Sequence, residues 1–437
     1  MMKYLLMLIM MFLIKNYWFV QYMMMMMFLF IIYSIKMNMN YEMIGYNYGA
    51  DLISMWLILL LLWIFSLIYM ASWILNKSVF NNYFIKLSIL LLIMLLLTFL
   101  FLNIFYFYLM FESSMIMMLL MIMSFGNQYE RVSASFYMLF YTLVMSLPLL
   151  LMIFWYMDNY SMLLMMNWIN DKLYKYLVIF LMLSFLVKLP MYLLHFWLPK
   201  AHDEASISGS MILAGILLKL GGYGLIRIGE LINNIIYSNM IFWYLIIYGI
   251  LSSLFISMMC MLQVDMKVMI AMSSIIHMNL LMSGYFSFYS LGIMGCLIIM
   301  ISHGLCSSGM FCLVSIVYNR LMSRSLLIIK GLMNLMPFLT LFWFLMCACN
   351  MSVPPSLNLL GEILVMSSIL SWLIYLFVFF ILYFIIGVVF SIYFFSITQF
   401  GEIIFLLMKL EIYLQEFLLM ILHLMPLNFL MVMSLFY

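Results

Sequence analysis

Two lysines near the middle of the chain lie in sequence that is otherwise almost wholly apolar. Lys188 and Lys219 fall within KLPMYLLHFWLPKAHDEASISGSMILAGILLKLGGYGLIR, residues 188–227, and each belongs to a run long enough to cross a bilayer. A cation at membrane depth costs roughly 2.5 to 3.5 kcal/mol on insertion scales. Because packing does not require that cost twice in neighbouring helices, the lysines indicate a functional ionisable pair inside a membrane.

Further ionisable groups extend this pair along the chain. Glu112 precedes the lysines, and His277 and Glu362 follow them, each inside a predicted span. A Glu112–Lys188 pair would be a coupled system, because each charge stabilises the ionised form of the other. Histidine titrates near neutral pH without help. Together these residues resemble a proton relay with acidic, basic and imidazole stations.

Three more histidines are weaker candidates for the relay. His195 and His202 lie in HFWLPKAHDEA and serve either proton uptake or interfacial anchoring. His303, in SHGLCSSGMF, is either a relay station or a core histidine among small residues that allow close helix packing. We expect Asp203 and Glu204 in a wet loop.

Each strong candidate also has a plainer explanation. Glu112 could hold two helices together by hydrogen bonding, and the two lysines could be purely structural. His423, in the last apolar run, has no obvious partner in the sequence, so we expect a structural role or lipid contact.

The composition defines the broad class of protein. The chain has 437 residues, of which 70% are hydrophobic and 7% charged, with a mean hydropathy of +1.27. Soluble domains carry about 25% charged residues, so this is a polytopic membrane protein. The length allows roughly 13 or 14 spans. A net charge of +3 without a basic run gives no indication of nucleic-acid binding.

Methionine usage points to a cellular origin. The chain contains 55 methionines. This number indicates a genetic code that reads an AT-rich codon as Met, as in animal mitochondria, with compositional drift as the alternative. The first residues lack an Arg-rich transit peptide. We therefore expect insertion into the mitochondrial inner membrane from inside the organelle.

No cofactor motif is visible in the sequence. The cysteines, all in apolar runs, show no metal-binding spacing and are predicted to be buried and inert. Gly221, Gly222 and Gly224 follow no strand and do not complete the GxGxxG pattern. Any redox chemistry must therefore occur in another chain.

Apolar runs separated by polar residues predict the helices. We expect an all-α polytopic membrane protein with about fourteen helices near 3–14, 17–35, 51–74, 84–102, 104–123, 133–156, 176–197, 207–228, 239–261, 267–283, 288–317, 333–373, 374–396 and 412–435. The eleventh and twelfth runs are too long for one straight span, so each is either tilted or broken. Arg227, at the end of the eighth run, is taken as a loop cation.

Prolines predict where helices break. Pro190 lies two residues after Lys188 in run seven, and Pro354 and Pro355 lie shortly before Glu362 in run twelve. Interrupted helices at corresponding places in two halves indicate an inverted repeat with its site at the breaks. The predicted divisions are therefore residues 1–83 (helices one to three), 84–230 (first five-helix repeat), 231–398 (second repeat) and 399–437 (helix fourteen).

Several long motifs resemble one known family. LPKAHDEASISGSMILAGILLKLGGYGLIRI, SHGLCSSGMFCL, NMSVPPSLNLLGEI, FESSMI and QVDMKVMIAMSSIIHM resemble the chain 4 family of mitochondrial NADH:ubiquinone oxidoreductase, respiratory complex I, in order and spacing over essentially the whole chain. The resemblance implies a proton-pumping, antiporter-like subunit with fourteen helices, an inverted repeat and no cofactor of its own. NADH, FMN, iron–sulfur clusters and ubiquinone would belong to the rest of the complex.

The resemblance also implies roles for individual residues. Glu112 matches a helix-five glutamate that pairs with the helix-seven lysine, here Lys188. Lys219 matches the central helix-eight lysine, His277 a histidine on the connecting axis, and Glu362 the terminal helix-twelve acid.

At three positions the chain departs from the family pattern. The family usually has HVEAP where this chain has HDEAS, so Asp203 and Ser206 are unusual, and it has YSS where this chain has Met272 in MSS. The first two changes leave the role of His202 in proton uptake open.

The function implied is proton translocation in the membrane arm of complex I, beside chains 2 and 5 and phospholipids such as cardiolipin. The first alternative is a cation/proton antiporter subunit, because such relatives share the lysine-bearing helices. The second is a structural membrane subunit whose charges are vestigial.

Overall fold

The protein is almost entirely helical, and many of its helices are long enough to span a membrane. The computed structural model describes residues 2–34, 42–45, 48–159, 175–236, 240–402 and 412–434. Among these residues, ten helices are long and apolar enough to cross a bilayer, and three shorter apolar helices accompany them. The prediction of a polytopic helical membrane protein is therefore confirmed at this level.

The chain divides into two compact units by its internal contacts. The first unit comprises Met1–Lys188 and Glu204–Asn239, and the second comprises Leu189–Asp203 and Met240–Tyr437. Lys188, Glu112 and Lys219 therefore belong to the first unit, and the histidine candidates belong to the second.

The first unit contains the early helices and one small hairpin. Its helices are α1 (Met2–Met11), α2 (Tyr17–Ser34), α3 (Leu52–Ala71), α4 (Trp73–Asn76), α5 (Asn81–Leu100), α6 (Ile104–Phe125), α7 (Arg131–Asn159), α8 (Lys175–Lys188), α10 (Ile207–Ile212), the π-helix η1 (Leu213–Leu217) and α11 (Leu218–Ile236). Strands β1 (Glu42–Gly45) and β2 (Tyr48–Ala50) pair antiparallel. The prediction of a purely α-helical chain missed this hairpin.

Local sequence explains where these helices begin. Asp51 accepts a hydrogen bond from the Ser54 N–H at 3.0 Å, and the Ser54 hydroxyl accepts one from the Asp51 N–H at 2.9 Å, which forms a capping box at the start of α3. Ser206, one of the residues that depart from the family pattern, accepts a hydrogen bond from the Gly209 N–H and caps α10.

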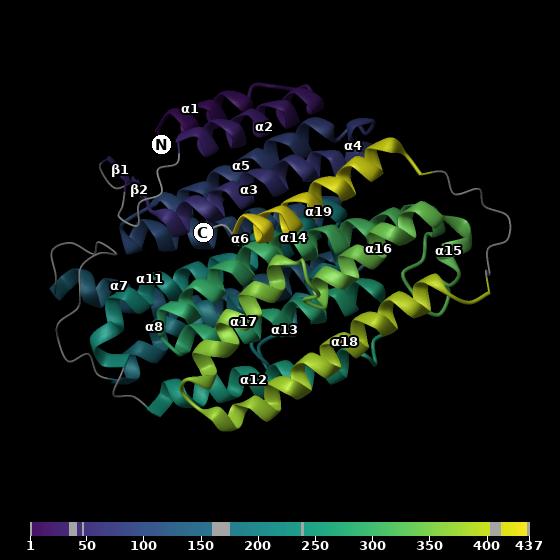
Figure 1. The fold of residues 1–437 in the computed structure, drawn as a ribbon. Helices are drawn as coiled ribbons and strands as arrows, with labels where there is room; N and C mark the ends of the chain where they lie inside the picture. The colour runs from purple at the N-terminus through teal and green to yellow at the C-terminus, as the bar shows by residue number, and fades with distance from the viewer. Residues whose placement is uncertain are drawn as a thin grey trace. The chain divides into compact units, whose positions relative to one another are not determined.

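Helices of the first unit pack in a sequence of neighbours. Helix α2 lies against α3, α3 against α5, α5 against α6, α6 against α7, α7 against α8, and α8 against α11 (Figure 1). Gly224 of α11 allows the last contact, because a Cβ at this position would lie 2.0 Å from Cε1 of Phe185. This close approach brings α8, which ends at Lys188, against the helix that carries Lys219.

The second unit is built around three long helices. Its elements are α9 (Trp197–Glu204, whose last residue is grouped with the first unit), α12 (Met240–Cys260), α13 (Met266–Phe286), α14 (Ser290–Leu321), α15 (Leu332–Leu335), α16 (Pro337–Asn350), α17 (Leu357–Leu370), η2 (Ile374–Leu376), α18 (Phe377–Gln399) and α19 (Leu414–Ser434). Helix α13 lies between α12 and α14, and α14 also contacts α16, α17 and α19 (Figure 1).

The predicted helix breaks are present. Helix α8 ends at Lys188, followed by turns around Pro190, and the next helix begins at Trp197. Run twelve divides into α16 and α17, with Pro354 and Pro355 between them. Run eleven, by contrast, is one unbroken helix of 32 residues, α14. The ends of three predicted runs, at 35, 239 and 435, lie outside the described residues.

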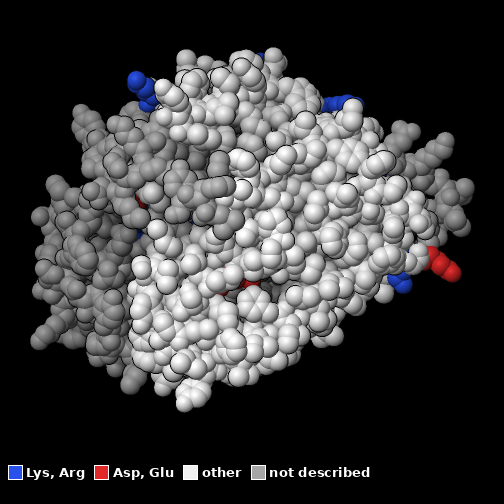
Figure 2. Space-filling model, viewed as in Figure 1, with Lys and Arg blue, Asp and Glu red and all other residues white. Residues whose placement is uncertain are grey.

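The outer helices expose apolar side chains. In α7, α18 and α19 only 33%, 28% and 28% of the most apolar stretch is buried. Figure 2 shows a wide face that is almost free of charged atoms, with most of its blue and red atoms near the rim. Such a surface fits contact with lipid or with neighbouring apolar subunits, and not with water.

Candidate functional site

Lys188 is held by a backbone carbonyl and an aromatic ring of α6. Its ammonium donates a hydrogen bond to the Phe111 carbonyl at 3.1 Å and lies 2.8 Å from the centroid of the Phe111 ring. Lys188 is also the last residue of α8, where the negative end of the helix dipole stabilises a cation. These contacts allow an ammonium to exist in surroundings where Lys188 is only 1% exposed.

Glu112 lies beside this lysine without touching it directly. Both carboxylate oxygens are buried, and neither has a hydrogen-bond partner among the described residues. The nearest polar influences on the carboxyl group are the Lys188 charge and the Ser146 hydroxyl. The predicted pair is therefore coupled through space, and a proton passing between the two groups needs a bridging water or a small side-chain movement.

Lys219 lies just beyond a π-helical turn. Its ammonium donates to the Ala214 carbonyl at 2.5 Å, and Ala214 belongs to η1. A π-turn interrupts the regular α-helical hydrogen bonds, and such turns are frequent at functional sites. The side chain is fully buried, and every residue in the most apolar 18-residue stretch of the span Ile207–Gly229 is buried as well.

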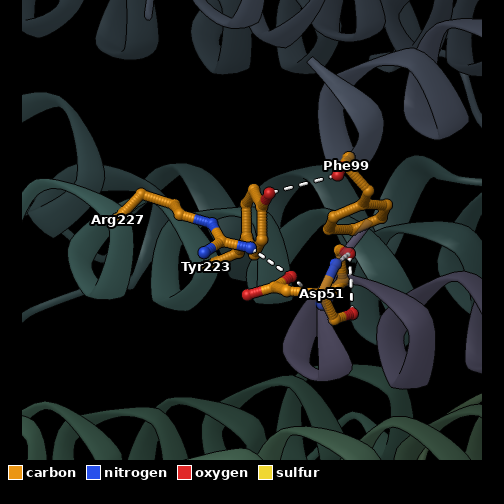
Figure 3. Close-up of polar contacts among 5 residues, drawn as sticks. Asp51, Phe99, Tyr223 and Arg227 are labelled. Atoms are coloured by element: carbon orange, nitrogen blue, oxygen red, sulfur yellow. Dashed lines mark hydrogen bonds and ion pairs between the residues drawn. The ribbon is translucent and has the colours of Figure 1, made fainter. Parts of the chain in front are cut away.

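A buried ion pair lies two helical turns beyond Lys219. Arg227 Nη2 is 2.5 Å from Oδ1 of Asp51, and the guanidinium lies over the Tyr223 ring (Figure 3). Arg227 is 1% exposed within α11, so its assignment to a loop was wrong. Burial alone would raise the pKa of Asp51, but Arg227 and the Ser54 hydrogen bonds outweigh that effect and lower it.

In the second unit, His277 is the centre of a hydrogen-bonded cluster. Its Nδ1 is 3.1 Å from Oε1 of Glu362, and its Nε2 is 3.2 Å from Oδ1 of Asn350. The Tyr383 hydroxyl donates to the same Glu362 oxygen at 3.3 Å and lies 3.5 Å from Nδ1. Helices α13, α16, α17 and α18 each contribute one of these residues.

The partners of His277 define which protonation states the cluster accepts. An imidazolium donates from both ring nitrogens, one to Glu362 and one to the Asn350 carbonyl oxygen. A neutral ring that keeps its proton on Nδ1 needs the Asn350 amide turned, so that its NH₂ donates to Nε2. Loss of the Nε2 proton would therefore require rotation of the Asn350 amide, whereas transfer of the Nδ1 proton to Glu362 leaves the amide in place.

His303 and a small cavity flank this cluster. The His303 ring centroid is 5.5 Å from that of His277. A cavity next to Asn350 is lined by Ser273 and Ser391 among mainly apolar side chains. These polar groups fit a bound water, which would give the cluster a further proton-carrying neighbour.

His195 and His202 lie in aromatic surroundings. His195, in the break after α8, is stacked between Tyr192 and Phe196, with ring centroids at 5.5 and 4.4 Å. His202 is stacked on Phe311 at 4.5 Å and is fully buried. Neither histidine has a described hydrogen bond to His277 or Glu362.

The acidic residues after His202 are not in a loop. Asp203 and Glu204 lie in α9, contrary to the expectation of a wet loop. Arg324 Nη1 donates to both the carboxylate and the carbonyl oxygen of Asp203, each at 2.7 Å. Burial raises the pKa of Asp203 although Arg324 partly opposes the shift. The unusual aspartate therefore anchors α9 to the segment after α14.

The remaining polar candidates are buried. All six cysteines are buried and free, as predicted. His423 is fully buried and contacts the Leu419 carbonyl at 2.8 Å, one turn earlier in α19. Among the described residues no group of three or more His, Cys, Asp or Glu could hold a metal ion.

Sequence reasoning missed two members of the cluster, Asn350 and Tyr383. Asn350 is the last residue of α16, next to the proline break, and a polar residue beside such a break was a usable signal. Tyr383 is one aromatic residue within a long apolar helix, where nothing in the local sequence distinguishes it.

Two protein-family models match the chain. The model described as NADH:quinone oxidoreductase/Mrp antiporter, TM matches residues 101–391. The model described as NADH-ubiquinone oxidoreductase chain 4, amino terminus matches residues 1–98. The two matches together cover most of the chain.

Individual relatives are similar over nearly their whole length. The chain is 44% identical to NADH-ubiquinone oxidoreductase chain 4 of Aedes aegypti, over 96% of this chain and 95% of the relative. It is 42% identical to the protein of the same name from Locusta migratoria, over 98% of each chain.

Solved structures share the fold. A chain of respiratory complex I from Thermus thermophilus with bound NADH superposes with a TM-score of 0.85 at 20% identity, covering 99% of this chain and 96% of that one. A chain of the Mrp complex from Dietzia sp. gives 0.74 at 15% identity, covering 81% and 67%.

Proposed function

Because the chain belongs to the NADH-ubiquinone oxidoreductase chain 4 family, we propose that it translocates protons in the membrane arm of that complex, through its buried Lys, Glu and His residues. It is a multi-pass membrane subunit of a proton-translocating enzyme, and the redox cofactors belong to other subunits. NADH oxidation supplies the energy elsewhere in the complex. In this chain the chemistry is confined to moving protons.

One observation carries the proposal: the direct contact of an imidazole with a carboxylate inside apolar helices. His277 and Glu362 are 3.1 Å apart, and Glu362 is 2% exposed. Buried ionisable groups in spanning helices are costly and mark ion or proton pathways. This pair can exchange a proton without moving any backbone.

The first unit supplies the other stations. We assign Glu112, Lys188 and Lys219 to proton transfer there, because each is an ionisable group whose charged atoms are buried within an apolar helix. A charge change in a neighbouring subunit would alter the Glu112–Lys188 equilibrium. The proton would then move at Lys219 and leave beyond Glu362.

His303, His195 and His202 have supporting roles in this scheme. The proximity of His303 to His277 favours a role beside the cluster. For His195 and His202 we propose proton uptake, although their aromatic stacking equally favours anchoring.

The finer architecture belongs to the same proposal. We propose fourteen spans, with residues 84–230 and 231–398 as inverted repeats between helices one to three (1–83) and a last helix (399–437). The supporting feature is that each repeat has a proline-interrupted helix with an ionisable residue, Lys188 or Glu362, beside the break.

The surroundings follow from the family. We propose the mitochondrial inner membrane as the location, and chains 2 and 5 together with phospholipids such as cardiolipin as direct neighbours. The sparsely buried helices α7, α18 and α19 offer apolar surface for those contacts.

Replacing Lys219 by Ala tests the proposal. Because the ammonium is fully buried and an alanine side chain cannot carry a proton, we expect proton translocation to be abolished while the complex still assembles. The measurement is the proton gradient formed per NADH oxidised by the complex in proteoliposomes. Lys86→Ala, which removes an exposed lysine from another spanning helix, is the matched control. Normal proton-coupled turnover in the Lys219 variant would refute the proposal.

The likeness to a chain of the Mrp complex supports one alternative, a cation/proton antiporter subunit. Purification distinguishes the two functions. Co-migration with a large NADH-oxidising assembly supports the respiratory role, whereas Na⁺-dependent proton exchange by the chain without that assembly supports the antiporter.

A further inference from the structure

The buried ion pair of the first unit has no part in the proposed relay. Asp51 is 7% exposed and Arg227 is 1% exposed, so both charges have left water. A buried ion pair is weak evidence for stability, because desolvation can exceed the attraction between the charges. Stability alone therefore does not explain the pair.

Arg227 shares one stripe of α11 with a relay lysine. Lys219, Tyr223 and Arg227 follow one another at intervals of four residues, which places them on the same helix face. The guanidinium lies 4.8 Å from the centroid of the Tyr223 ring, and the Tyr223 hydroxyl donates to the Phe99 carbonyl at 3.1 Å (Figure 3). The stripe is thus fixed to α3 through Asp51 and to α5 through Phe99.

An aromatic column leads from this stripe to Lys188. Tyr223 contacts Phe107, with ring centroids 6.0 Å apart, and Phe107 contacts Phe111 at 5.5 Å. Phe185 of α8 packs against both phenylalanines. The Lys188 ammonium contacts both the ring and the backbone carbonyl of Phe111. The aromatic column therefore ends at Lys188, a residue of the proposed relay.

We propose that Asp51, Arg227 and Tyr223 are positioning residues: the ion pair holds the face of α11 that sets Lys219, and through the aromatic column it sets Lys188 relative to Glu112. The inference rests on the proposed proton translocation and adds residues to it. None of the three gains or loses a proton in the transfer.

The sequence offers a clean way to test the ion pair. Asp51→Asn removes the charge that holds Arg227, while asparagine still caps α3, because Asn and Asp are equally good N-caps. We expect the rate of proton translocation per NADH oxidised to fall about twofold to tenfold, within the range of couplings transmitted by such networks. Uncoupled NADH oxidation and the amount of assembled complex remain near wild type.

A second pair of variants tests the column independently of the charge. Tyr223→Leu removes the ring between Arg227 and Phe107, whereas Tyr223→Phe keeps the ring and removes only the hydroxyl. We expect Tyr223→Leu to reduce the rate of proton translocation as much as Asp51→Asn does. Tyr223→Phe should retain most of the wild-type rate. This comparison also decides the matter if Asp51→Asn fails to assemble.

Glu416→Gln is the matched control, because it neutralises an ion pair with Arg320 in the second unit, between α19 and α14. Wild-type translocation in Asp51→Asn, or equal effects of the two Tyr223 variants, would overturn the inference. Lys219→Ala is measured alongside. If the Lys219→Ala complex still translocates protons, the proposed function fails. If Lys219→Ala abolishes translocation but Asp51→Asn leaves it unchanged, only the positioning role fails.

Discussion

The two units hold the candidate residues of the proton relay in opposite ways. In the first unit Lys188 and Lys219 contact backbone carbonyls, and the Glu112 carboxylate has no described hydrogen bond. In the second unit His277 and Glu362 contact each other directly, with Asn350 and Tyr383 around them.

This difference teaches how a proton can move in each unit. Groups that already lie within hydrogen-bonding distance, as Nδ1 of His277 and Oε1 of Glu362 do, can exchange a proton by rearranging only side chains. Groups held apart by carbonyls and rings need a movement or an incoming water before they can react. The first unit is therefore suited to respond to a distant signal, and the second to transfer protons readily.

The largest expected effect comes from Glu362→Gln, which tests the second unit, where the two ionisable groups contact each other directly. Glutamine cannot accept the proton of His277, so we expect proton translocation to fall by roughly a hundredfold or more, as for loss of a general base. The measurement is the proton gradient per NADH oxidised. Tyr383→Phe, which leaves the His277–Glu362 contact intact, should cost far less. Equal losses in the two variants would show that the hydroxyl, and not the direct contact, decides transfer.

A smaller effect is expected from Phe111→Leu, which tests the unit held by carbonyls and rings. Leucine keeps the backbone carbonyl that accepts from Lys188 but removes the ring, and a desolvated cation–π contact is worth about 2 kcal/mol. We expect translocation to fall severalfold. Phe105→Leu, in the same helix but away from Lys188, is the control. Equal rates of proton translocation in the Phe111→Leu and Phe105→Leu variants would show that the Phe111 ring has no specific effect on proton transfer at Lys188.

The smallest effect is expected from Asp203→Asn, at an ion pair of the second unit outside the cluster. Because the pKa of Asp203 is raised in the folded protein, its contribution to stability falls as pH rises through that value. Asparagine does not titrate. The thermal midpoint of the wild type should therefore fall relative to that of the variant as the pH rises from the ordinary pKa of an aspartate through the raised pKa of Asp203.

Since Asp203 is partly exposed, the change should correspond to about 1 kcal/mol or less. Proton translocation should be unaffected. A loss of translocation in this variant would extend the functional part of the second unit from the His277 cluster to α9.

The sequence predicted the helices well because apolar runs and prolines are local signals. The breaks at Pro190 and at Pro354 and Pro355 lie where expected. The π-turn at Leu213–Leu217 was not foreseen, because one glycine among Leu, Ala and Ile does not distinguish a π-turn from a regular apolar helix. The hairpin of β1 and β2 was missed because it is short and lies between two apolar runs.

The candidate site was predictable only in part. Charged residues in apolar runs stand out, so Lys188, Lys219 and Glu362 were identified from type alone. Asn350 and Tyr383 acquire their roles from which helices meet at His277, and that is a tertiary property. Arg227 was misassigned because the helix continues to Ile236, further than hydropathy indicated.

The π-turn before Lys219 makes chain length matter at this point. A π-turn contains one residue more than the α-turn it replaces, and each residue of an α-helix advances about 100° around the axis. The extra residue is thus taken up inside the turn, and Lys219, Tyr223 and Arg227 keep the positions in which they face Asp51 and the aromatic column. Deletion of one residue between 213 and 217 would convert the π-turn into an α-turn and should be tolerated, whereas insertion of one residue into the regular helix between Leu218 and Lys219 would turn Lys219, Tyr223 and Arg227 by about 100° away from these partners.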